Sequence, residues 1–568
     1  MQYLKSTLVS VTVLTFAAAC SQQPEQVDAS ASSLALAAFP PITDNDGYVD
    51  TDFSATYREH LRTLASDEFE GRAPGTRGED LTVEYVRNVY QQAGLTSLTD
   101  DSYTQMVPMA RIAPTRVTNM LISDGEQTSE FSYRQEMMGW TQRITDAVEV
   151  TDSEMVFVGY GIVAPEYDWN DYAGLDVEGK TVVMLVNDPG YATQNESLFN
   201  GNAMTYYGRW TYKFEEAARQ GADAVIIVHE TGPAGYGWGV VAGGSPVRFS
   251  LKTDDLNMHR SKIESWITED AAQRLFSNIG LTLDEARDQA LSADFTPIDL
   301  ERTLSMTVEN EFEFFETANV IGMLEGSTYP DEHVIYMAHW DHMGTDPISG
   351  EIFNGAQDNA SGSAALLSLA EEFGKGEQPE RSILFLMVGA EERGLLGSLW
   401  YGEEPLLPLD QAVAGINMDM QNMYGPMRDF VVVGWNNSTM QDVAAPFVEA
   451  QNRYLAPETN PETGFFYRSD HFSLANKGVP MLYAKGGIDH FEKGKEYGRE
   501  MFEYLFAELY HKPADEYDPE WDLRGMQQDL WIYFRVGYEL ANSRQWPSWT
   551  SGNEFEAERL ATDHLRAD

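Results

Sequence analysis

Histidines and carboxylates follow the apolar segments in the C-terminal half of this sequence. The runs 334–338, 383–388 and 412–416 each lead directly into ionisable side chains, and another carboxylate precedes the small-residue-rich segment 360–373. The groups concerned are His339, Asp341, Asp358, Glu391, Glu392 and Asp419. Carboxylates gathered in one place repel one another and resist ionisation unless cations neutralise them. If the fold brings them together, this set therefore indicates a metal centre.

Mixed imidazole and carboxylate ligands suit Zn²⁺, which keeps coordination positions open for water and substrate when it is catalytic. Two ions about 3.5–4 Å apart share a bridging carboxylate and hold a water between them. Asp358 lies in the middle of the set and is the natural bridge. Taken singly, each of these residues is more often structural than catalytic; for instance, an Asp that opens a helix is usually its cap. Their joint arrival predicts two Zn²⁺ ions per chain.

The elements that must position these groups alternate between strand and helix. We expect strands at 334–338, 383–388 and 412–416 and a buried helix at 360–373. A strand-helix-strand unit is right-handed and places the strand C-termini and the helix N-terminus at one edge of the sheet, where ligands bind. The predicted fold class is α/β, with a mixed, mainly parallel central sheet flanked by helices.

Five segments together resemble the co-catalytic zinc aminopeptidase family, which includes bacterial leucyl-type aminopeptidases, glutamate carboxypeptidase and the inactive transferrin receptor. They are 337–342 (MAHWDH), 355–362 (GAQDNASG), 390–392 (AEE), 417–419 (NMD) and 510–515 (YHKPAD). The resemblance implies that His339 and Asp419 bind one zinc, that Glu392 and His511 bind the other, and that Asp358 binds both.

The same resemblance implies roles for three more side chains. Glu391 resembles the general base, Asp341 the carboxylate that orients His339, and Tyr510 the phenol that stabilises the oxyanion. The peptide bond between Asp358 and Asn359 is expected to be cis.

One ligand position has an alternative in the sequence. The loop 468–472 (RSDHF) also carries plausible ligands, and the residues alone do not reject His471. The Tyr-His-x-Pro-x-Asp pattern favours His511, which leaves Asp470 and His471 as supporting or pocket-wall residues. We expect His342 and His490 to be wall or structural histidines.

The resemblance implies hydrolysis of a peptide bond at a chain terminus, most simply by an aminopeptidase. A carboxypeptidase or dipeptidase of the same family, a glutaminyl cyclase-like acyltransferase and an inactive binding relative are the alternatives. The presence of all five ligands argues against the inactive relative. The β-rich region 148–300 resembles a protease-associated domain, which favours a peptidase over a cyclase.

The chain divides into six predicted parts. We expect a signal peptide at 1–19, a tether at 20–46, the first part of the peptidase domain at 47–147, the inserted domain at 148–300, the catalytic domain at 301–547 and a C-terminal tail at 548–568. Cys20 is the only cysteine, so it cannot form a disulfide within the chain. Its place directly after the apolar leader resembles the lipobox of bacterial lipoproteins.

The balance of charges limits the partners. Asp and Glu total 90 against 38 Lys and Arg, a formal net charge of −52. Such a surface repels nucleic acid and anionic lipid. We therefore expect peptide substrates, no nucleic acid, and membrane attachment only through a lipid on Cys20. This predicts an exported lipoprotein, anchored in the outer membrane of a Gram-negative bacterium and facing the periplasm or the cell surface.

Overall fold

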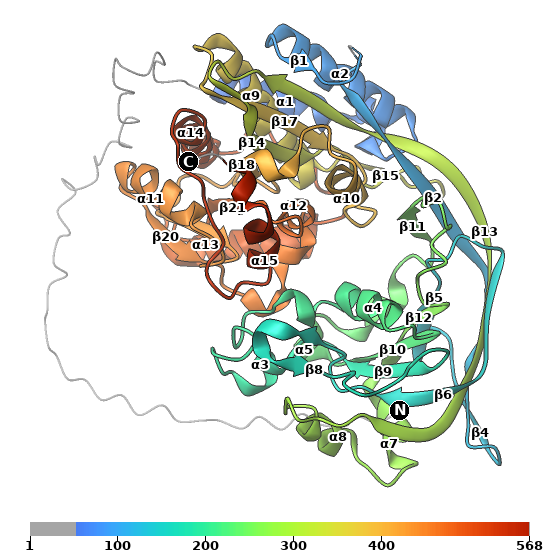
Figure 1. The fold of residues 1–568 in the computed structure, drawn as a ribbon. Helices are drawn as coiled ribbons and strands as arrows, with labels where there is room; N and C mark the ends of the chain where they lie inside the picture. Colours follow the sequence, from blue (N-terminus) through green and yellow to red (C-terminus); the bar gives the residue numbers. More distant parts are fainter. Residues whose placement is uncertain (1–52, 101, 567–568) are drawn as a thin grey trace, which may run out of the picture.

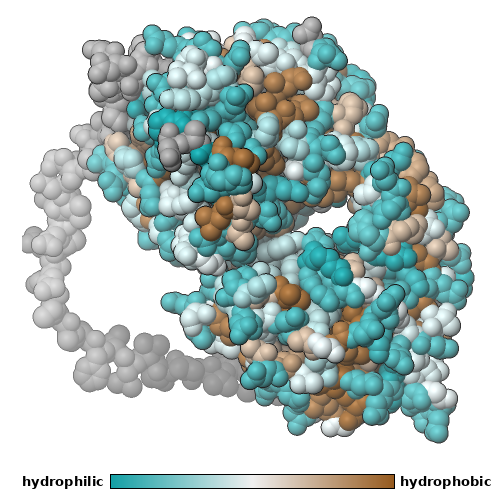
Figure 2. Space-filling model, viewed as in Figure 1, coloured by the Kyte–Doolittle hydropathy of each residue, from teal (hydrophilic) through white to brown (hydrophobic). Residues whose placement is uncertain are grey.

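The computed structural model describes residues 53–100 and 102–566, which form two lobes joined by a long antiparallel ribbon (Figure 1). The ribbon consists of β2 (Thr104–Val117) and β13 (Ile298–Leu324), paired from Thr104 with Val320 to Val117 with Val308. We call residues 53–103 and 318–566 the main lobe and residues 118–307 the inserted lobe. The visible face is mostly hydrophilic, with apolar side chains in small groups (Figure 2).

The main lobe is built on a mixed, mainly parallel sheet, as predicted. β14 lies between β17 and β18, and all three run parallel, as do the pairs β18–β21 and β19–β20. The pairs β13–β17 and β19–β21 are antiparallel. The strands are β14 (Tyr329–His339), β17 (Arg381–Val388), β18 (Ala412–Asn417), β19 (Asp429–Val433), β20 (Tyr454–Pro457) and β21 (Met481–Gly486).

Helices cover both faces of this sheet. Alternate residues of β14 enter different apolar clusters, Tyr336 one and Met337 the other, because successive side chains of a strand point to opposite faces. The first cluster contains side chains from α1, α2, α9 and α14, and the second contains side chains from α10 and α12. These helices are α1 (Ser54–Leu64), α2 (Arg77–Gln92), α9 (Ser361–Lys375), α10 (Leu396–Glu403), α12 (His471–Ala475) and α14 (Arg524–Ala541). The buried helix expected at 360–373 is α9.

The inserted lobe has a parallel sheet of its own, in the order β6, β9, β10 and β12, with β5 antiparallel at its edge. These strands are β5 (Met137–Trp140), β6 (Ala147–Phe157), β9 (Thr181–Leu185), β10 (Ala224–His229) and β12 (Ile263–Thr268). Leu275 of α7 (Glu269–Ser277) packs on one face and Phe214 of α4 (Trp210–Arg219) on the other. The lobe is therefore a layered α/β unit rather than a purely β-rich one.

Two boundaries differ from those expected. Met120, Ile122 and Phe131 belong to an apolar cluster of the inserted lobe, so that lobe begins before residue 148. At the other end, the segment expected to be a tail packs on the main lobe. Its Arg559 is buried and donates hydrogen bonds to the backbone carbonyls of Ala412 and Val413.

The predicted leader and tether, Cys20 included, lie outside the described residues. None of the helices within 53–100 and 102–566 is long and apolar enough to cross a lipid bilayer.

Candidate metal centre

Four segments bring ionisable side chains to the carboxyl edge of the main sheet. His339 ends β14, Glu391 and Glu392 follow β17, and Asp419 follows β18. Asp358 lies on the turn directly before α9. The parallel strands therefore place these groups at one edge, as the sequence predicted.

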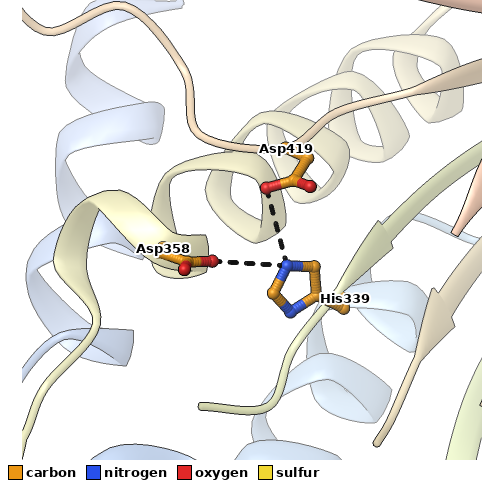
Figure 3. Close-up of side chains that lie close together, drawn as sticks. All are labelled: His339, Asp358 and Asp419. Atoms are coloured by element: carbon orange, nitrogen blue, oxygen red, sulfur yellow. Dashed lines mark ion pairs between the residues drawn. The ribbon is translucent and has the colours of Figure 1, made fainter. Parts of the chain in front are cut away.

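The first cluster is formed by His339, Asp358 and Asp419 (Figure 3). His339 Nε2 lies 3.5 Å from Asp358 Oδ1 and 3.6 Å from Asp419 Oδ1. All three side chains are buried, and His339 Nε2 and Asp419 Oδ1 have no hydrogen-bond partner among the described residues. Tetrahedral ligands about 2.0 Å from one zinc are roughly 3.3 Å from each other. The spacing and the missing partners both fit a shared cation.

A second cluster lies on the other oxygen of Asp358. His511 Nε2 is 3.2 Å from Asp358 Oδ2 and 3.0 Å from Glu392 Oε2. The two oxygens of one carboxylate thus face two different imidazoles. This arrangement is the one expected of a bridging ligand.

His342 contributes a contact that was not predicted. Its Nδ1 lies 2.7 Å from Glu392 Oε1, and together with Asp358 and Glu392 it forms a second group whose atoms could hold a metal ion. Glu392 is therefore contacted by His342 on one oxygen and by His511 on the other. The sequence feature that could have indicated this contact is the position of His342 directly after Asp341.

The other histidines considered from the sequence lie apart from these clusters. Nδ1 of His471 is 3.4 Å from Nδ2 of Asn417, and its ring packs against Phe466 and Tyr483. Nδ1 of His490 accepts hydrogen bonds from two backbone N–H groups. Neither histidine belongs to a candidate metal group in the described part of the chain.

The bridging segment is held by a second set of polar contacts. The buried Asp515 accepts hydrogen bonds from the backbone N–H groups of Gln357 (2.8 Å) and Asp358 (3.0 Å). Oδ1 of Asn359 accepts from Gly362 N at 2.8 Å. The peptide bond between Asp358 and Asn359 is cis, as expected. Asp515 thus positions the residue that joins the two clusters, a role the sequence did not suggest.

Asp341 organises the neighbouring turn. Its carboxylate accepts hydrogen bonds from the backbone N–H groups of Glu391 (2.9 Å) and Glu392 (3.3 Å). His339 Nδ1 lies nearer to the backbone oxygen of Asp341 (3.2 Å) than to its carboxylate (3.8 Å). The structure therefore places Asp341 where it touches both His339 and the 391–392 turn.

The two adjacent glutamates have opposite acidities. Burial raises the pKa of Glu391 well above its ordinary value, and the nearby carboxylates of Glu392 and Asp470 raise it further. Burial also opposes ionisation of Glu392, but the imidazoles of His511 and His342 outweigh it and hold that pKa well below its ordinary value. Two neighbouring carboxyl groups whose pKa values differ in this way are typical of sites in which one group transfers a proton and the other stays ionised.

A small cavity connects these groups. Its volume is about 10 Å³, close to the roughly 10–15 Å³ that one water molecule needs. It is lined by Asp358, Glu391, Asp419, Met420, Phe465, Arg468 and Tyr510. The ring of Tyr510 stacks on that of His511 at 3.8 Å between centroids, and its hydroxyl lies 3.5 Å from Arg468. Glu391 and Tyr510, predicted to be catalytic, thus face the same space as two of the predicted ligands.

Comparison with known proteins gives short but consistent matches. The chain is 38% identical over 123 residues to Aminopeptidase NAALADL1 of Mus musculus, and 32% identical over 121 residues to the Probable glutamate carboxypeptidase VP8 of Zea mays. These matches cover 21% and 20% of this chain but only 15% and 16% of the relatives' length. The solved structure of an aminopeptidase from Aneurinibacillus sp. strain AM-1 aligns with 20% identity over 87% of this chain and 94% of its own, with a TM-score of 0.47.

One family model covers the elements that carry the site. It extends from the end of β13 into α14 and contains every residue of the two clusters. Residues 319–534 of this chain match the model of peptidase family M28.

Proposed function

We propose that this protein is a metal-dependent exopeptidase, most simply an aminopeptidase, that uses two zinc ions held by His339, Asp358, Glu392, Asp419 and His511. The observation that carries the proposal is the bridging geometry of Asp358, whose two oxygens lie 3.5 Å and 3.2 Å from two different imidazole nitrogens. The match of residues 319–534 to a peptidase family supports the same reaction class.

The chain's own groups supply proton transfer and charge stabilisation. Zinc bound by these residues would lower the pKa of a water molecule and would supply positive charge to polarise a carbonyl group. Glu391, which lines the small cavity, would take a proton from a water held there and pass it to the leaving amine, a role that the raised pKa of its carboxyl group favours. The hydroxyl of Tyr510 donates a hydrogen bond to the oxygen that becomes negative.

The inserted lobe limits access to this site. Its Met204 N donates to Pro461 O at 3.1 Å, and its Asn202 Nδ2 donates to Glu462 Oε2 at 3.0 Å. The loop contacted in this way leads into Phe465, which lines the small cavity. We propose that this contact narrows the approach to the site, which favours a chain end over the middle of a polypeptide.

Location and partners belong to the same proposal. We propose peptide substrates, and an exported protein held to the outer membrane by a lipid on Cys20. Metabolic labelling with a radioactive fatty acid, compared between the full chain and Cys20→Ala, tests the anchor. Equal labelling of both proteins rejects it.

The activity is tested with aminoacyl p-nitroanilides beside peptides blocked at either end. We expect release of the terminal residue, loss of activity on dialysis against a chelator, and recovery with Zn²⁺. Activity that persists in protein shown by elemental analysis to lack metal contradicts the proposal. Mass analysis of a Gln-initiated peptide separates hydrolysis, which adds water, from cyclisation, which loses ammonia.

A further inference from the structure

A larger pocket lies next to the metal cavity. Its volume is about 280 Å³, and Met420 and Phe465 line both spaces, so the pocket begins at the candidate metal centre. Most of its wall is apolar, including Val431, Val433, Ala456, Phe502, Leu505 and Phe506. A substrate held by its terminal peptide bond at the metal centre would place the adjoining side chain in this pocket.

Lys485 lies among these apolar side chains. Lys485 Nζ donates hydrogen bonds to the backbone oxygen of Asp419 at 2.9 Å and to the hydroxyl of Tyr483 at 3.4 Å. No carboxylate forms an ion pair with it in the part of the chain that the structure describes. A lysine ammonium has three donors. These two contacts leave one donor at the end of the pocket nearest the metal centre.

The carboxylates of the same pocket are engaged by the backbone. The oxygens of Asp429 accept from Asp489 N (2.8 Å) and Ile488 N (2.9 Å). Oε1 of Glu458 accepts from Gly434 N at 3.1 Å. The other lysine of the lining, Lys495, is exposed. Among the charged side chains of this pocket, Lys485 is the one that contacts the backbone of a candidate metal ligand, so its positive charge lies next to the metal centre.

Two more cations near the metal cavity lack an anionic partner. Arg468 lines that cavity. Burial lowers the pKa of Arg209 in the inserted lobe, and the nearby positive charge of Arg468 lowers it further. The Nε atom of Arg209 is buried without a hydrogen-bond partner, and neither guanidinium pairs with a carboxylate in the described residues. In a chain of net charge −52, cations without ion pairs close to the same two cavities favour an anionic ligand.

We propose that this pocket receives the side chain of the substrate's terminal residue, and that Lys485 makes it selective for glutamate. A glutamate side chain combines an apolar stem, which suits the wall, with a carboxylate, which suits the ammonium. A charged hydrogen bond inside an apolar pocket is stronger than one in water, and a lysine or arginine side chain would meet a like charge. The proposal rests on the proposed exopeptidase function and names its substrate class.

The test compares kcat/KM for the p-nitroanilides of Glu, Gln, Leu and Lys in the wild-type protein, Lys485→Met and Lys493→Met. We expect the wild type to prefer Glu and to reject Lys. In Lys485→Met the ratio of Glu to Leu should fall by about tenfold or more, because methionine keeps the stem and removes the charge. Lys493→Met, at an exposed position outside the pocket lining, should leave that ratio unchanged.

Three results separate the possibilities. A ratio of Glu to Leu that is unchanged in Lys485→Met overturns the proposal. An equal loss on all four substrates, with reduced zinc content, also overturns it, because it would show that Lys485 only supports the Asp419 segment. If the wild-type protein cleaves none of these compounds or the corresponding peptides, the proposed exopeptidase function itself fails.

Discussion

The two lobes share an architecture, but the polar side chains at their strand ends differ in hydrogen bonding. Both contain a parallel sheet flanked by helices, and both place polar side chains after the strands. In the inserted lobe Asp188 follows β9, and its carboxylate accepts from Gly190 N at 3.0 Å and Thr205 N at 3.1 Å. His229 ends β10, and its Nε2 contacts the backbone oxygen of Tyr236 at 3.1 Å.

The corresponding atoms of the main lobe have no such partners. His339 Nε2 and Asp419 Oδ1 are buried and without hydrogen bonds, although they lie only 3.6 Å apart. Leaving a buried polar group unsatisfied costs about 1–3 kcal/mol, and more when it is charged. Topology alone therefore does not make a site. The distinguishing feature is a strand end whose polar groups remain unpaired within the protein.

The largest expected effect comes from replacing the bridge. Asp358→Asn weakens a carboxylate shared by both clusters, so we expect loss of bound zinc and a fall in kcat of more than about a thousandfold. The matched change in the inserted lobe is Asp188→Asn, which should lower the melting temperature while the folded fraction keeps its zinc. Metal content measured on the folded fraction of each variant checks both. Equal loss of zinc in the two variants would contradict the conclusion that only the strand ends of the main lobe bind metal.

The next effect separates proton transfer from metal binding within the main lobe. Glu391 lines the cavity but belongs to neither candidate metal group in the described residues. Glu391→Gln should therefore keep its zinc and lose about 10²–10⁴-fold in kcat, the usual contribution of a general base. Zinc content and turnover measured on the same sample test this expectation. Near-normal turnover would remove Glu391 from the mechanism.

A smaller effect is expected at His342, which the sequence predicted to be a wall or structural histidine. His342→Phe removes the 2.7 Å contact with Glu392 and should weaken zinc affinity by about 10–100-fold, as is typical when the partner of a ligand is lost. His229→Phe is the control, because it makes the same histidine-to-phenylalanine change at a buried position of the inserted lobe. We expect it to lower thermal stability only. Zinc titration against a competing chelator distinguishes the two variants.

Much of the main lobe could be predicted because its strands are buried on both faces and read as continuous apolar runs. The runs 334–338, 383–388 and 412–416 became β14, β17 and β18, and the polar residues after them fixed the edge of the site. His511 could not be placed in this way. It follows a helical turn far along the chain and adopts φ of 55°, so only its motif pointed to Asp358.

Contacts between segments far apart in the chain could not be predicted from the sequence. Met120 and Ile122 alternate with exposed residues as any half-buried strand does, and nothing local shows which lobe they will join. Lys485 ends an apolar strand, where a lysine is ordinarily solvated. The role proposed for Lys485 depends on the contact between β21 and the Asp419 segment, which the sequence does not show.

The smallest expected effect concerns the contact between the lobes. Glu554 of the main lobe accepts hydrogen bonds from Tyr467 Oη at 2.7 Å and from Tyr206 N of the inserted lobe at 3.1 Å. Burial raises the pKa of Glu554 to about 7. The folded protein thus binds this proton more tightly than the unfolded chain, so the stabilising contribution is complete below about pH 4.5 and is lost as pH rises toward 7.

Glu554→Gln keeps an acceptor at this position and cannot ionise. We therefore expect hydrogen exchange of the 204–208 segment to quicken between pH 5 and pH 8 in the wild type, beyond the intrinsic effect of pH, and to follow only the intrinsic effect in the variant. Glu558→Gln, at an exposed position of the helix that follows (Glu556–Ala561), is the matched control and should behave as the wild type does. Identical profiles for all three proteins would mean that the junction is held by the aromatic packing of Tyr206 and Phe472 rather than by this carboxyl group.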